Sequence, residues 1–474
     1  MIDESVLYLP VRHLAERIRT RELSPVELAE SYLARSEQWN PRLNAYVTLT
    51  RELAMEQARA AEKEIAAGNY RGPLHGIPYA AKDLLAARGY PTTWGAPPYA
   101  AQRFDYDAAV IERLQRAGAV LIGKAAMIEL AGGLGYDSGY ASLTGPCRNP
   151  WNTKYWTCGS SSGSGAIVAA GLAAFALGSD TRGSIICPST HCGISGMRPS
   201  FGRVSRYGAM AFAWSMDKIG PMCRTADDCG LVLEAIAGSD ARDHGSLPSP
   251  LADFAYNGLR PGGRPLRIAR LTNAFPHAAR ELHDAADRAL RVLEQNGAQV
   301  SDAEIPAGPF EEAAELVILM EAASAFSDTI DSGRAAQLVD PLGRINGYAS
   351  REFSAQDYLH VQRVRLFLQQ SIDRLFERFD VISAPGEGDT ADELQPPEGT
   401  APSDDSEPND SLQPDAISSL CGLPAVTVPC GFDNNRMPIG IQFMARALDD
   451  QSALAAASLL QAHSDWHNRH PTLT

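Results

Sequence analysis

The stretch CGSSSGSGAIVAAG, residues 158–171, places four serines among glycines and then continues into small apolar residues. Serine and glycine by themselves are typical of a flexible linker. A linker has no need of a buried continuation, yet residues 166–178 are almost entirely apolar and rich in alanine, which predicts a buried helix. We therefore interpret the serine-rich stretch as an ordered loop that holds a serine hydroxyl, a potential nucleophile, at a fixed place.

Two further stretches carry groups that suit such a hydroxyl. GIPYAAKDLLA (76–86) places Lys82 in a largely apolar run, and GSDTRGSIICPS (178–189) places Ser184 in a tight turn before another apolar segment. Composition alone explains Lys82 equally well as a lysine at the end of a strand whose ammonium reaches solvent. If Lys82 is buried, desolvation favours its neutral amine, which accepts a proton near pH 7.

Three short motifs offer other chemistries. GSSSG (159–163) matches the G-x-S-x-G nucleophile elbow and would nominate Ser161, but none of the ten histidines lies in a segment that the sequence identifies as a catalytic loop. SMDK (215–218) fits S-x-x-K, but neither S-D-N nor K-T-G accompanies it. GAVLIGKA (118–125) lacks the Ser or Thr that a phosphate-binding loop needs for Mg²⁺. A histidine-based hydrolase remains an alternative, and nucleotide binding is not expected.

Taken together, these stretches resemble the amidase signature family, whose enzymes hydrolyse amide bonds with a serine–serine–lysine triad. The resemblance puts Ser160 at the bridging serine, which that family holds next to a cis peptide bond, Ser184 at the nucleophile 24 residues later, and Lys82 in the lysine motif. It covers most of the chain. Further matching stretches are GKAAMIEL (123–130), RNPWN (148–152), GMRPSFGRVSRYG (196–208), MDKIGPM (216–222), GLPAVTVPCG (422–431) and MPIGIQFMA (437–445).

The resemblance implies a catalytic role for each of these residues. A neutral Lys82 would take the proton of Ser184 through Ser160, and attack on a carbonyl would create an oxyanion that needs backbone N–H donors. The candidate donors are the N–H groups of Thr181, Arg182, Gly183 and Ser184. Ser161 would help to hold the lysine by a hydrogen bond, or would only pack in its loop.

The nucleophile turn departs from the family pattern. Where family members commonly have T-G-G-S-I-R, this chain has TRGSII, residues 181–186. Arg182 replaces a glycine, so its φ must suit a residue with a Cβ, or the oxyanion hole is altered. Ile186 removes an arginine whose usual role is structural, and Cys158 and Ser162 also stand where glycines are usual.

The elements that position these residues follow a helical start and an alternating remainder. Residues from about 9 to 67 predict helices ending at Gly68, and from Gly76 short apolar runs alternate with helical segments, which indicates an α/β sheet. The runs predicted as strands are IPYAAK, AVLIGK, FALGSD, DVISAP (380–385) and PAVTVPCG (424–431), with amphipathic helices at 280–300 and 353–379. The resemblance implies the amidase signature fold, an α/β fold with one central mixed β-sheet covered by helices on both faces.

We expect a single large domain spanning 1–474. Its expected parts are a helical N-terminal part (1–68), a signature core (about 70–225), a less recognisable substrate-pocket region (about 226–380) and an acidic, proline-rich surface loop (about 386–414). That loop is either a tolerated insertion or a lid over a substrate pocket. Residues 132–136 and 212–214 are candidate pocket walls, with ordinary core packing as the alternative.

Composition excludes several classes of function. Hydrophobic residues make up 45% of the 474 residues and the formal net charge is −15, so the chain has material for a large core and repels nucleic acid and anionic membranes. The start of the chain has no secretory signal, and the apolar run 166–178 is well short of the roughly 20 residues that span a membrane. We therefore expect a cytoplasmic protein.

Eight cysteines are scattered without C-x-x-C pairs or the His/Cys spacing of a zinc site. The pattern predicts buried free thiols, and we expect neither a metal nor a cofactor.

The leading hypothesis is a hydrolase that cleaves C–N bonds of small-molecule amides, or anilides, carbamates or esters, through an acyl-enzyme on Ser184, as a monomer or homodimer. One alternative is the glutaminase (A) subunit of a tRNA-dependent amidotransferase, although no recognisable glutamine-binding signature occurs around 340–370. The other is an inactive binding homologue in which Arg182 has spoiled the oxyanion hole.

Overall fold

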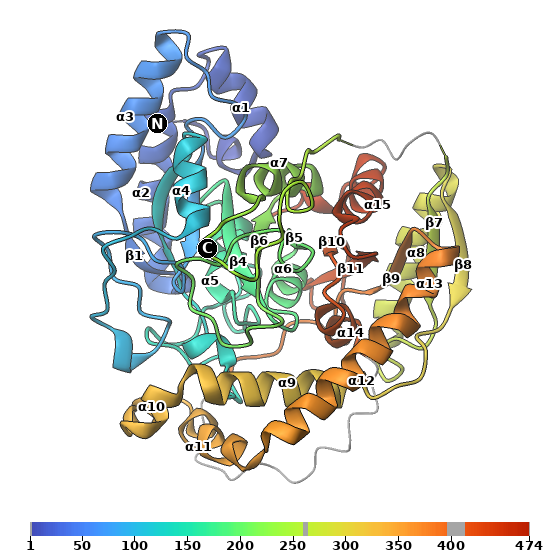
Figure 1. Ribbon diagram of the computed structural model, residues 1–474. Coiled ribbons are helices and arrows are strands. Elements are labelled where there is room, and N and C mark those ends of the chain that lie inside the picture. Colours follow the sequence, from blue (N-terminus) through green and yellow to red (C-terminus); the bar gives the residue numbers. More distant parts are fainter. Residues whose placement is uncertain (1, 259–263, 396–412, 474) are drawn as a thin grey trace.

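The computed structural model describes residues 2–258, 264–395 and 413–473. At its centre lies an 11-stranded sheet with the order β1-β3-β2-β4-β6-β5-β10-β11-β9-β7-β8 (Figure 1). The strands are Tyr46–Leu49 (β1), Pro78–Lys82 (β2), Val120–Ala125 (β3), Phe175–Asp180 (β4), Ser195–Arg198 (β5), Lys218–Cys223 (β6), Arg267–Leu271 (β7), Gln299–Ala303 (β8), Val381–Pro385 (β9), Ala425–Phe432 (β10) and Pro438–Ala445 (β11).

The sheet is mixed, as expected. β2 is parallel to both of its neighbours, β3 and β4, and β7 is parallel to β8 and β9. The pairings between these two groups are antiparallel, as is that of β1 with β3. All residues of β2, β3 and β11 are buried, which explains their continuous apolar sequences, because a strand covered on both faces has no polar side.

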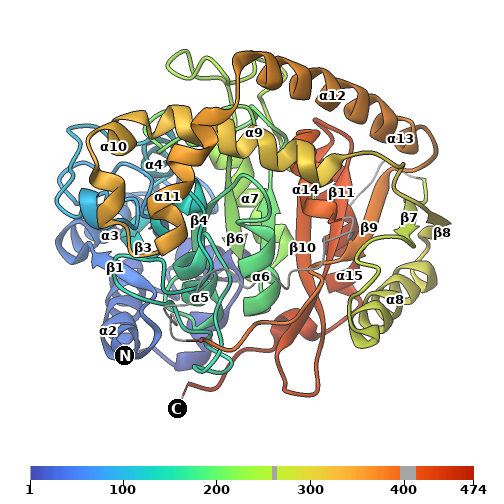
Figure 2. The same cartoon turned by 90° about the horizontal axis from the view of Figure 1, so that it is seen from below.

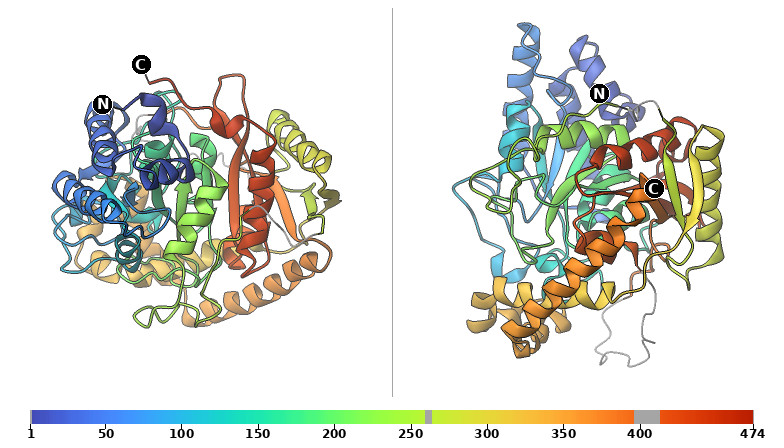
Figure 3. Two further views of the ribbon diagram at one scale, coloured as in Figure 1. Left: turned by 90° about the horizontal axis from the view of Figure 1, so that it is seen from above. Right: turned by 45° about the vertical axis from the view of Figure 1, so that its right-hand side comes forward.

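Helices cover both faces of the sheet. α5 and α6 pack together on one face, and α7 and α15 pack together on the other (Figure 2). α9 to α12 run along one side of the molecule, and α1 to α3 lie near β1 at one end of the sheet (Figures 1 and 3). The helices are Val11–Arg19 (α1), Pro25–Leu43 (α2), Arg51–Ala66 (α3), Ala109–Arg116 (α4), Ser162–Ala169 (α5), Ile186–Cys192 (α6), Ala226–Ile236 (α7), Arg280–Gln295 (α8), Phe310–Ala325 (α9), Ser327–Asp331 (α10), Pro341–Ala349 (α11), Ala355–Asp373 (α12), Leu375–Arg378 (α13), Pro414–Leu420 (α14) and Asp450–Ala462 (α15).

The N-terminal part is not helical throughout, so that prediction was wrong for one segment. α2 ends at Leu43, and the following Asn44 adopts a left-handed conformation with φ 54°. The next residues form the edge strand β1, whose Tyr46 is buried and pairs with Ala125 of β3. The β-formers of YVTL were the signal for this strand, since Tyr, Val and Thr favour strands over helices.

The predicted buried helix across 166–178 was also wrong in its second half. α5 begins at Ser162, four residues early, and stops at Ala169. Gly171 then takes a left-handed φ of 64°, the conformation in which glycine commonly ends helices, and Phe175 starts β4. The strand predicted from FALGSD is therefore correct, and the helix ends before it.

The acidic loop begins where predicted, directly after β9, and α14 starts at Pro414. Its described part runs beside residues 154–156: Trp156 N–H donates to Asp392 O at 2.8 Å, and Leu394 N–H donates to Lys154 O at 2.8 Å. The question of a lid falls mainly on residues 396–412, which lie outside the described residues.

Candidate active site

Three segments meet at one edge of the sheet. Lys82 is the last residue of β2, Asp180 is the last residue of β4, and the two strands are parallel neighbours. Because the carboxyl ends of parallel strands point to the same edge, Lys82 and the turn formed by residues 181–184 lie close together. The third segment is the turn before α5, which carries Ser160 and Ser161 and contains a cis peptide bond between Gly159 and Ser160.

Lys82 is fully buried among hydroxyl groups. Its Nζ donates to Ser160 Oγ at 2.7 Å, to Ser161 Oγ at 2.9 Å and to Ser179 Oγ at 2.9 Å. Burial lowers the pKa of Lys82 to about 7, even though Asp180 and Asp217 favour the charged form. Within the described part of the chain no carboxylate oxygen lies within 4.0 Å of this Nζ, so a neutral amine is accessible near pH 7.

The hydroxyls of Ser160 and Ser161 have different surroundings. Ser161 Oγ accepts from Lys82 Nζ and from Ser179 N–H (3.3 Å) and donates to Ser179 O (3.1 Å). Ser160 Oγ accepts from Lys82 Nζ and has no other hydrogen-bond partner among the described residues. Ser161 is therefore committed to holding the lysine against β4, whereas the Ser160 proton is free to move.

Ser184 lies beside the Ser160 turn and nearer to the surface. Ser161 N–H donates to Ser184 O at 3.3 Å, which places the two turns next to each other. Lys82 and Ser160 are buried, whereas Ser184 is half-buried. In the described structure no hydrogen bond joins Ser184 Oγ to Ser160 Oγ. Lys82, Ser160 and Ser184 therefore lie in one site, but only Lys82 and Ser160 are in direct contact.

Asp180 organises the turn that carries Ser184. Its carboxylate accepts from Gly183 N–H at 2.9 Å and from Ile185 N–H at 2.7 Å, and Arg198 Nη1 donates to the same carboxylate at 3.1 Å. Although burial favours the neutral acid, Arg198 and Lys218 hold the pKa of Asp180 below its usual value. Sequence reasoning missed Asp180 because an aspartate at a strand end is common, and only the fold shows its N–H donors.

The same contacts sort the four candidate oxyanion donors. Gly183 N–H is engaged by Asp180, so it points into the turn. The N–H groups of Thr181, Arg182 and Ser184 donate to no acceptor in the described part of the chain. Three of the four candidate N–H groups thus have no protein acceptor among the described residues, and the fourth shapes the turn.

Arg182 does not distort the turn. The residue in the left-handed conformation is Gly183, with φ 86°. Arg182 has a negative φ, which suits a residue with a Cβ. The Arg182 guanidinium points to α9, where it forms ion pairs with Glu311 and, at 3.0 Å, with Glu315. Its charge is therefore balanced by α9, and its backbone N–H keeps its place in the turn.

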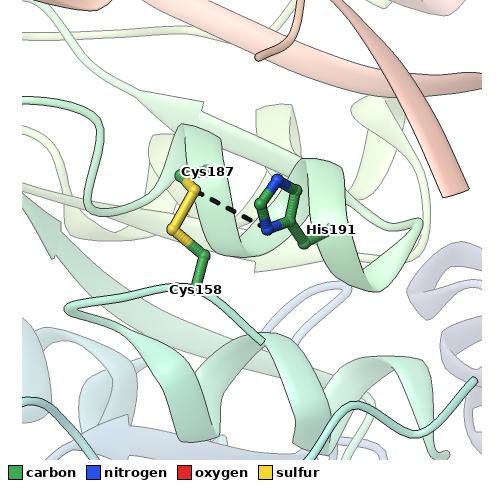
Figure 4. A group of neighbouring side chains, drawn as sticks. All are labelled: Cys158, Cys187 and His191. Atoms are coloured by element: carbon green, nitrogen blue, oxygen red, sulfur yellow. Dashed lines mark hydrogen bonds between the residues drawn. A yellow bond between two sulfur atoms is a disulfide. The ribbon is translucent and has the colours of Figure 1, made fainter. Parts of the chain in front are cut away.

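A disulfide joins the two serine turns, which corrects the prediction of free thiols for two of the eight cysteines. Cys158 and Cys187 are bonded, with their Cα atoms 6.0 Å apart, and His191 lies beside them (Figure 4). Twenty-nine residues separate the two cysteines, and nothing in their spacing indicates a pair. The other six cysteines are buried free thiols, as predicted: Cys147, Cys192, Cys223, Cys229, Cys421 and Cys430.

Two carboxyl groups lie near the nucleophile turn, Glu387 shortly after β9 and Asp415 in α14. A Cβ on Gly183 would lie 2.9 Å from Asp415 Oδ2, so this carboxyl touches the turn. Burial raises the pKa of Asp415 to about 7, and burial together with Asp415 raises the pKa of Glu387 well above its usual range. Glu387 therefore retains its proton near neutral pH, and this side of the site is less negative than its acids suggest.

Two cavities border these elements. A cavity of about 300 Å³ is lined by both bonded cysteines, by Gln413 and by Glu387. A cavity of about 770 Å³ is lined by Phe212, by Trp214 and by residues of α9 and α12, but not by Lys82, Ser160 or Ser184. Trp214 is exposed, whereas Phe212 is buried, so whether these residues form a wall of the substrate pocket stays a prediction. Of the other predicted wall, Tyr136 is half-buried against the Gly159 turn, with its hydroxyl oxygen 3.3 Å from where a Cβ of Gly159 would lie.

Comparison with known proteins gives a consistent result. The family model described as Amidase matches residues 27–454. The chain is 36% identical to the glutamyl-tRNA(Gln) amidotransferase A subunit of Methylococcus capsulatus over 490 aligned positions, covering 97% of each chain. No helix in the described ranges combines the length and the apolar character that a membrane span needs.

Solved structures agree with the family match. The native peptide amidase from Stenotrophomonas maltophilia superposes with a TM-score of 0.84 at 29% identity, covering 98% of each chain. A bacterial aryl acylamidase of the amidase signature enzymes superposes with a TM-score of 0.86 at 25% identity, covering 97% of each chain.

Proposed function

The chain belongs to the amidase family, whose enzymes act on amide C–N bonds, and from that premise we propose that it hydrolyses small-molecule amides through an acyl-enzyme on Ser184. Ser160 is the relay and Lys82 is the base. The observation that carries the proposal is the environment of Lys82: a fully buried amine, bonded to three serine hydroxyls, with a pKa of about 7. A lysine with those properties suits proton abstraction rather than ion pairing.

The reaction follows from this placement. Ser184 Oγ attacks the carbonyl carbon while its proton passes to Ser160 Oγ and the Ser160 proton passes to Lys82 Nζ. The oxyanion of the tetrahedral intermediate accepts from the free N–H groups of the 181–184 turn. Lys82 returns the proton through Ser160 to the departing amine, and water then repeats the sequence on the ester, releasing the acid and restoring Ser184. The net reaction consumes one water and yields one acid and one amine.

Replacement of single hydroxyls tests the assignment. Ser184→Ala should abolish turnover while the protein stays folded, because one lost hydroxyl costs about 1 kcal/mol of stability. Ser160→Ala should lower kcat by about 10²- to 10⁴-fold, the usual worth of proton transfer in catalysis. Ser162→Ala is the matched control, since Ser162 is a buried serine at the start of α5 whose hydroxyl, among the described residues, hydrogen-bonds only to Ala126 O, at 3.4 Å.

The substrates for this test are a p-nitroanilide, an aliphatic amide, a carbamate, an ester and glutamine. Full anilide or amide turnover in Ser184→Ala would contradict the assignment of the nucleophile. Absence of turnover on every substrate by the folded wild-type protein would instead favour the inactive homologue.

A second candidate, the glutaminase subunit of an amidotransferase, is supported by the 36% identity to proteins of that name over nearly the whole chain. A subunit needs a surface for its partners, and α12 exposes Leu359 (60%), Leu366 (57%) and Phe367 (66%) on one side. The discriminating experiment compares glutamine hydrolysis by the chain alone and with the other subunits of a relative's amidotransferase. Glutaminase activity that appears only with those subunits favours the second candidate.

A further inference from the structure

The Cys158–Cys187 disulfide connects the two turns on which the proposed reaction depends. Cys158 lies two residues before Ser160, and Cys187 lies three residues after Ser184. Their sulfurs cross from the Ser160 turn to the first turn of α6 (Figure 4).

We propose that Cys158 and Cys187 are positioning residues for the reaction of Ser184. Their bond limits how far the Ser160 turn can move from Ser184, so that the two hydroxyls can come within proton-transfer distance when substrate is bound. This inference rests on the proposed function, because it assigns the bond a role only if Ser160 relays a proton from Ser184.

The other ties between the two turns are weak. The direct hydrogen bond from Ser161 N–H to Ser184 O is long, at 3.3 Å. The hydrogen bond that Lys82 Nζ donates to Ser160 Oγ holds Ser160 against β2, but it does not fix the distance between Ser160 and Ser184. Proton transfer between two oxygens needs a separation of about 2.6–3.2 Å, and a misplacement of about 1 Å costs on the order of 10²-fold in rate. A covalent link supplies the restraint that the hydrogen bonds lack.

The bond is also within reach of a reductant. Both cysteines line the cavity of about 300 Å³, and Cys187 is only half-buried. A water-soluble phosphine reduces a disulfide by giving it two electrons: the phosphine takes oxygen from water to become its oxide, and the two protons of that water go to the thiols. The reaction breaks the covalent link between the two turns without changing any other side chain.

The neighbouring histidine makes one control necessary. The donor atoms of Cys158, Cys187 and His191 all lie within 4.8 Å of one another, a spacing that also suits a metal ion. The sulfur ligand of metals is the thiolate, so two sulfurs bonded to each other provide no such ligand in this structure. Reduction frees the thiols, and a chelator in the reduced samples excludes metal binding as a cause of any effect.

The test measures the rate at which a fluorophosphonate probe labels Ser184, a readout that needs no knowledge of the natural substrate. Oxidised wild type, phosphine-reduced wild type and the Cys158→Ala/Cys187→Ala double variant are compared, all with chelator, and mass spectrometry counts free thiols. We expect the reduced protein and the double variant to label at least about tenfold more slowly, with re-oxidation restoring the wild-type rate. On an anilide substrate the loss should appear in kcat with KM unchanged.

The matched control is Cys192→Ala, which removes a buried free thiol of the same helix. Before reduction this variant should be labelled at the wild-type rate. After phosphine treatment its labelling should slow by the same factor as that of wild type. Equal labelling of oxidised and fully reduced wild type overturns the inference, as does a loss that only follows the unfolded fraction measured by circular dichroism. Failure of the oxidised wild type to label at Ser184 at all would instead count against the proposed function.

Discussion

Replacing Lys82 with methionine should remove the proposed base and, with it, a pH-dependent part of the stability of the protein. Methionine fills a similar volume without a titratable group. The pKa of Lys82 falls from its usual 10.5 to about 7 on folding, because burial disfavours the ammonium ion. In the pH range between these two values the unfolded chain holds a proton that the folded protein has released.

The sign and size of the effect follow from that difference. Because the unfolded state binds more protons, the free energy of unfolding rises with pH, by about 1.4 kcal/mol per pH unit for one group. Between pH 7.5 and 9.5 the stability cost of burying the Lys82 amine falls by about 2.5 kcal/mol, and Lys82→Met has no such cost. With an unfolding entropy of about 1 kcal/mol/K for a chain of this length, the Tm of wild type should rise relative to that of the variant by about 2.5 °C over this range.

The assay records thermal unfolding of both proteins at pH 7.5, 8.5 and 9.5, and kcat/KM for an anilide from pH 5.5 to 9.5. Wild-type kcat/KM should rise with an apparent pKa of about 7 that belongs to the coupled lysine and serines, and Lys82→Met should lose about 10²- to 10⁴-fold. Lys63→Met is the control for activity, because Lys63 is an exposed lysine of α3 and belongs to none of the segments that form the site. A Tm difference that stays constant with pH would refute the neutral lysine.

The remaining predictions concern the nucleophile turn. Gly183→Ala should lower both Tm and kcat, because φ is 86° and the new Cβ would lie 2.9 Å from Asp415 Oδ2, a strain of about 1–3 kcal/mol; unchanged kcat would contradict the proposed turn geometry. Arg182→Gly should change kcat by less than about tenfold, since the backbone N–H remains, and should cost about 1–2 kcal/mol through the lost pairing with Glu311 and the added chain entropy. A loss of kcat beyond about 10²-fold would instead give the guanidinium a part in catalysis.

Much of the sheet could be predicted from the sequence, because buried strands leave continuous apolar runs such as those of β2, β3 and β10. The failures have local causes. β1 was missed because four residues between two long helices give little periodicity, and α5 was extended because the alanine-rich run continues past the Gly171 stop. Both outcomes had a short local signal, the β-formers of YVTL and the helix-ending Gly171, but the longer helical pattern around each signal outweighed it.

The residues of the site could be proposed from sequence, but their surroundings could not. Lys82, Ser160 and Ser184 were chosen through resemblance, and composition left the burial of Lys82 open. The role of Asp180 and the Cys158–Cys187 bond depend on which segments meet in space, over 29 residues in the case of the bond. Such contacts are set by the whole fold, so only the structure reveals them.

The central claim, an acyl-enzyme on Ser184, is tested most directly by trapping it. The protein is mixed with a p-nitrophenyl ester, quenched in acid during turnover and digested, and the acylated peptide is identified by mass spectrometry. The account predicts an acyl group on Ser184, close to one per molecule during the burst, and none on the Ser184→Ala variant. An acyl group on Ser160 or Ser161 instead, or steady turnover with no acylated peptide, would contradict it.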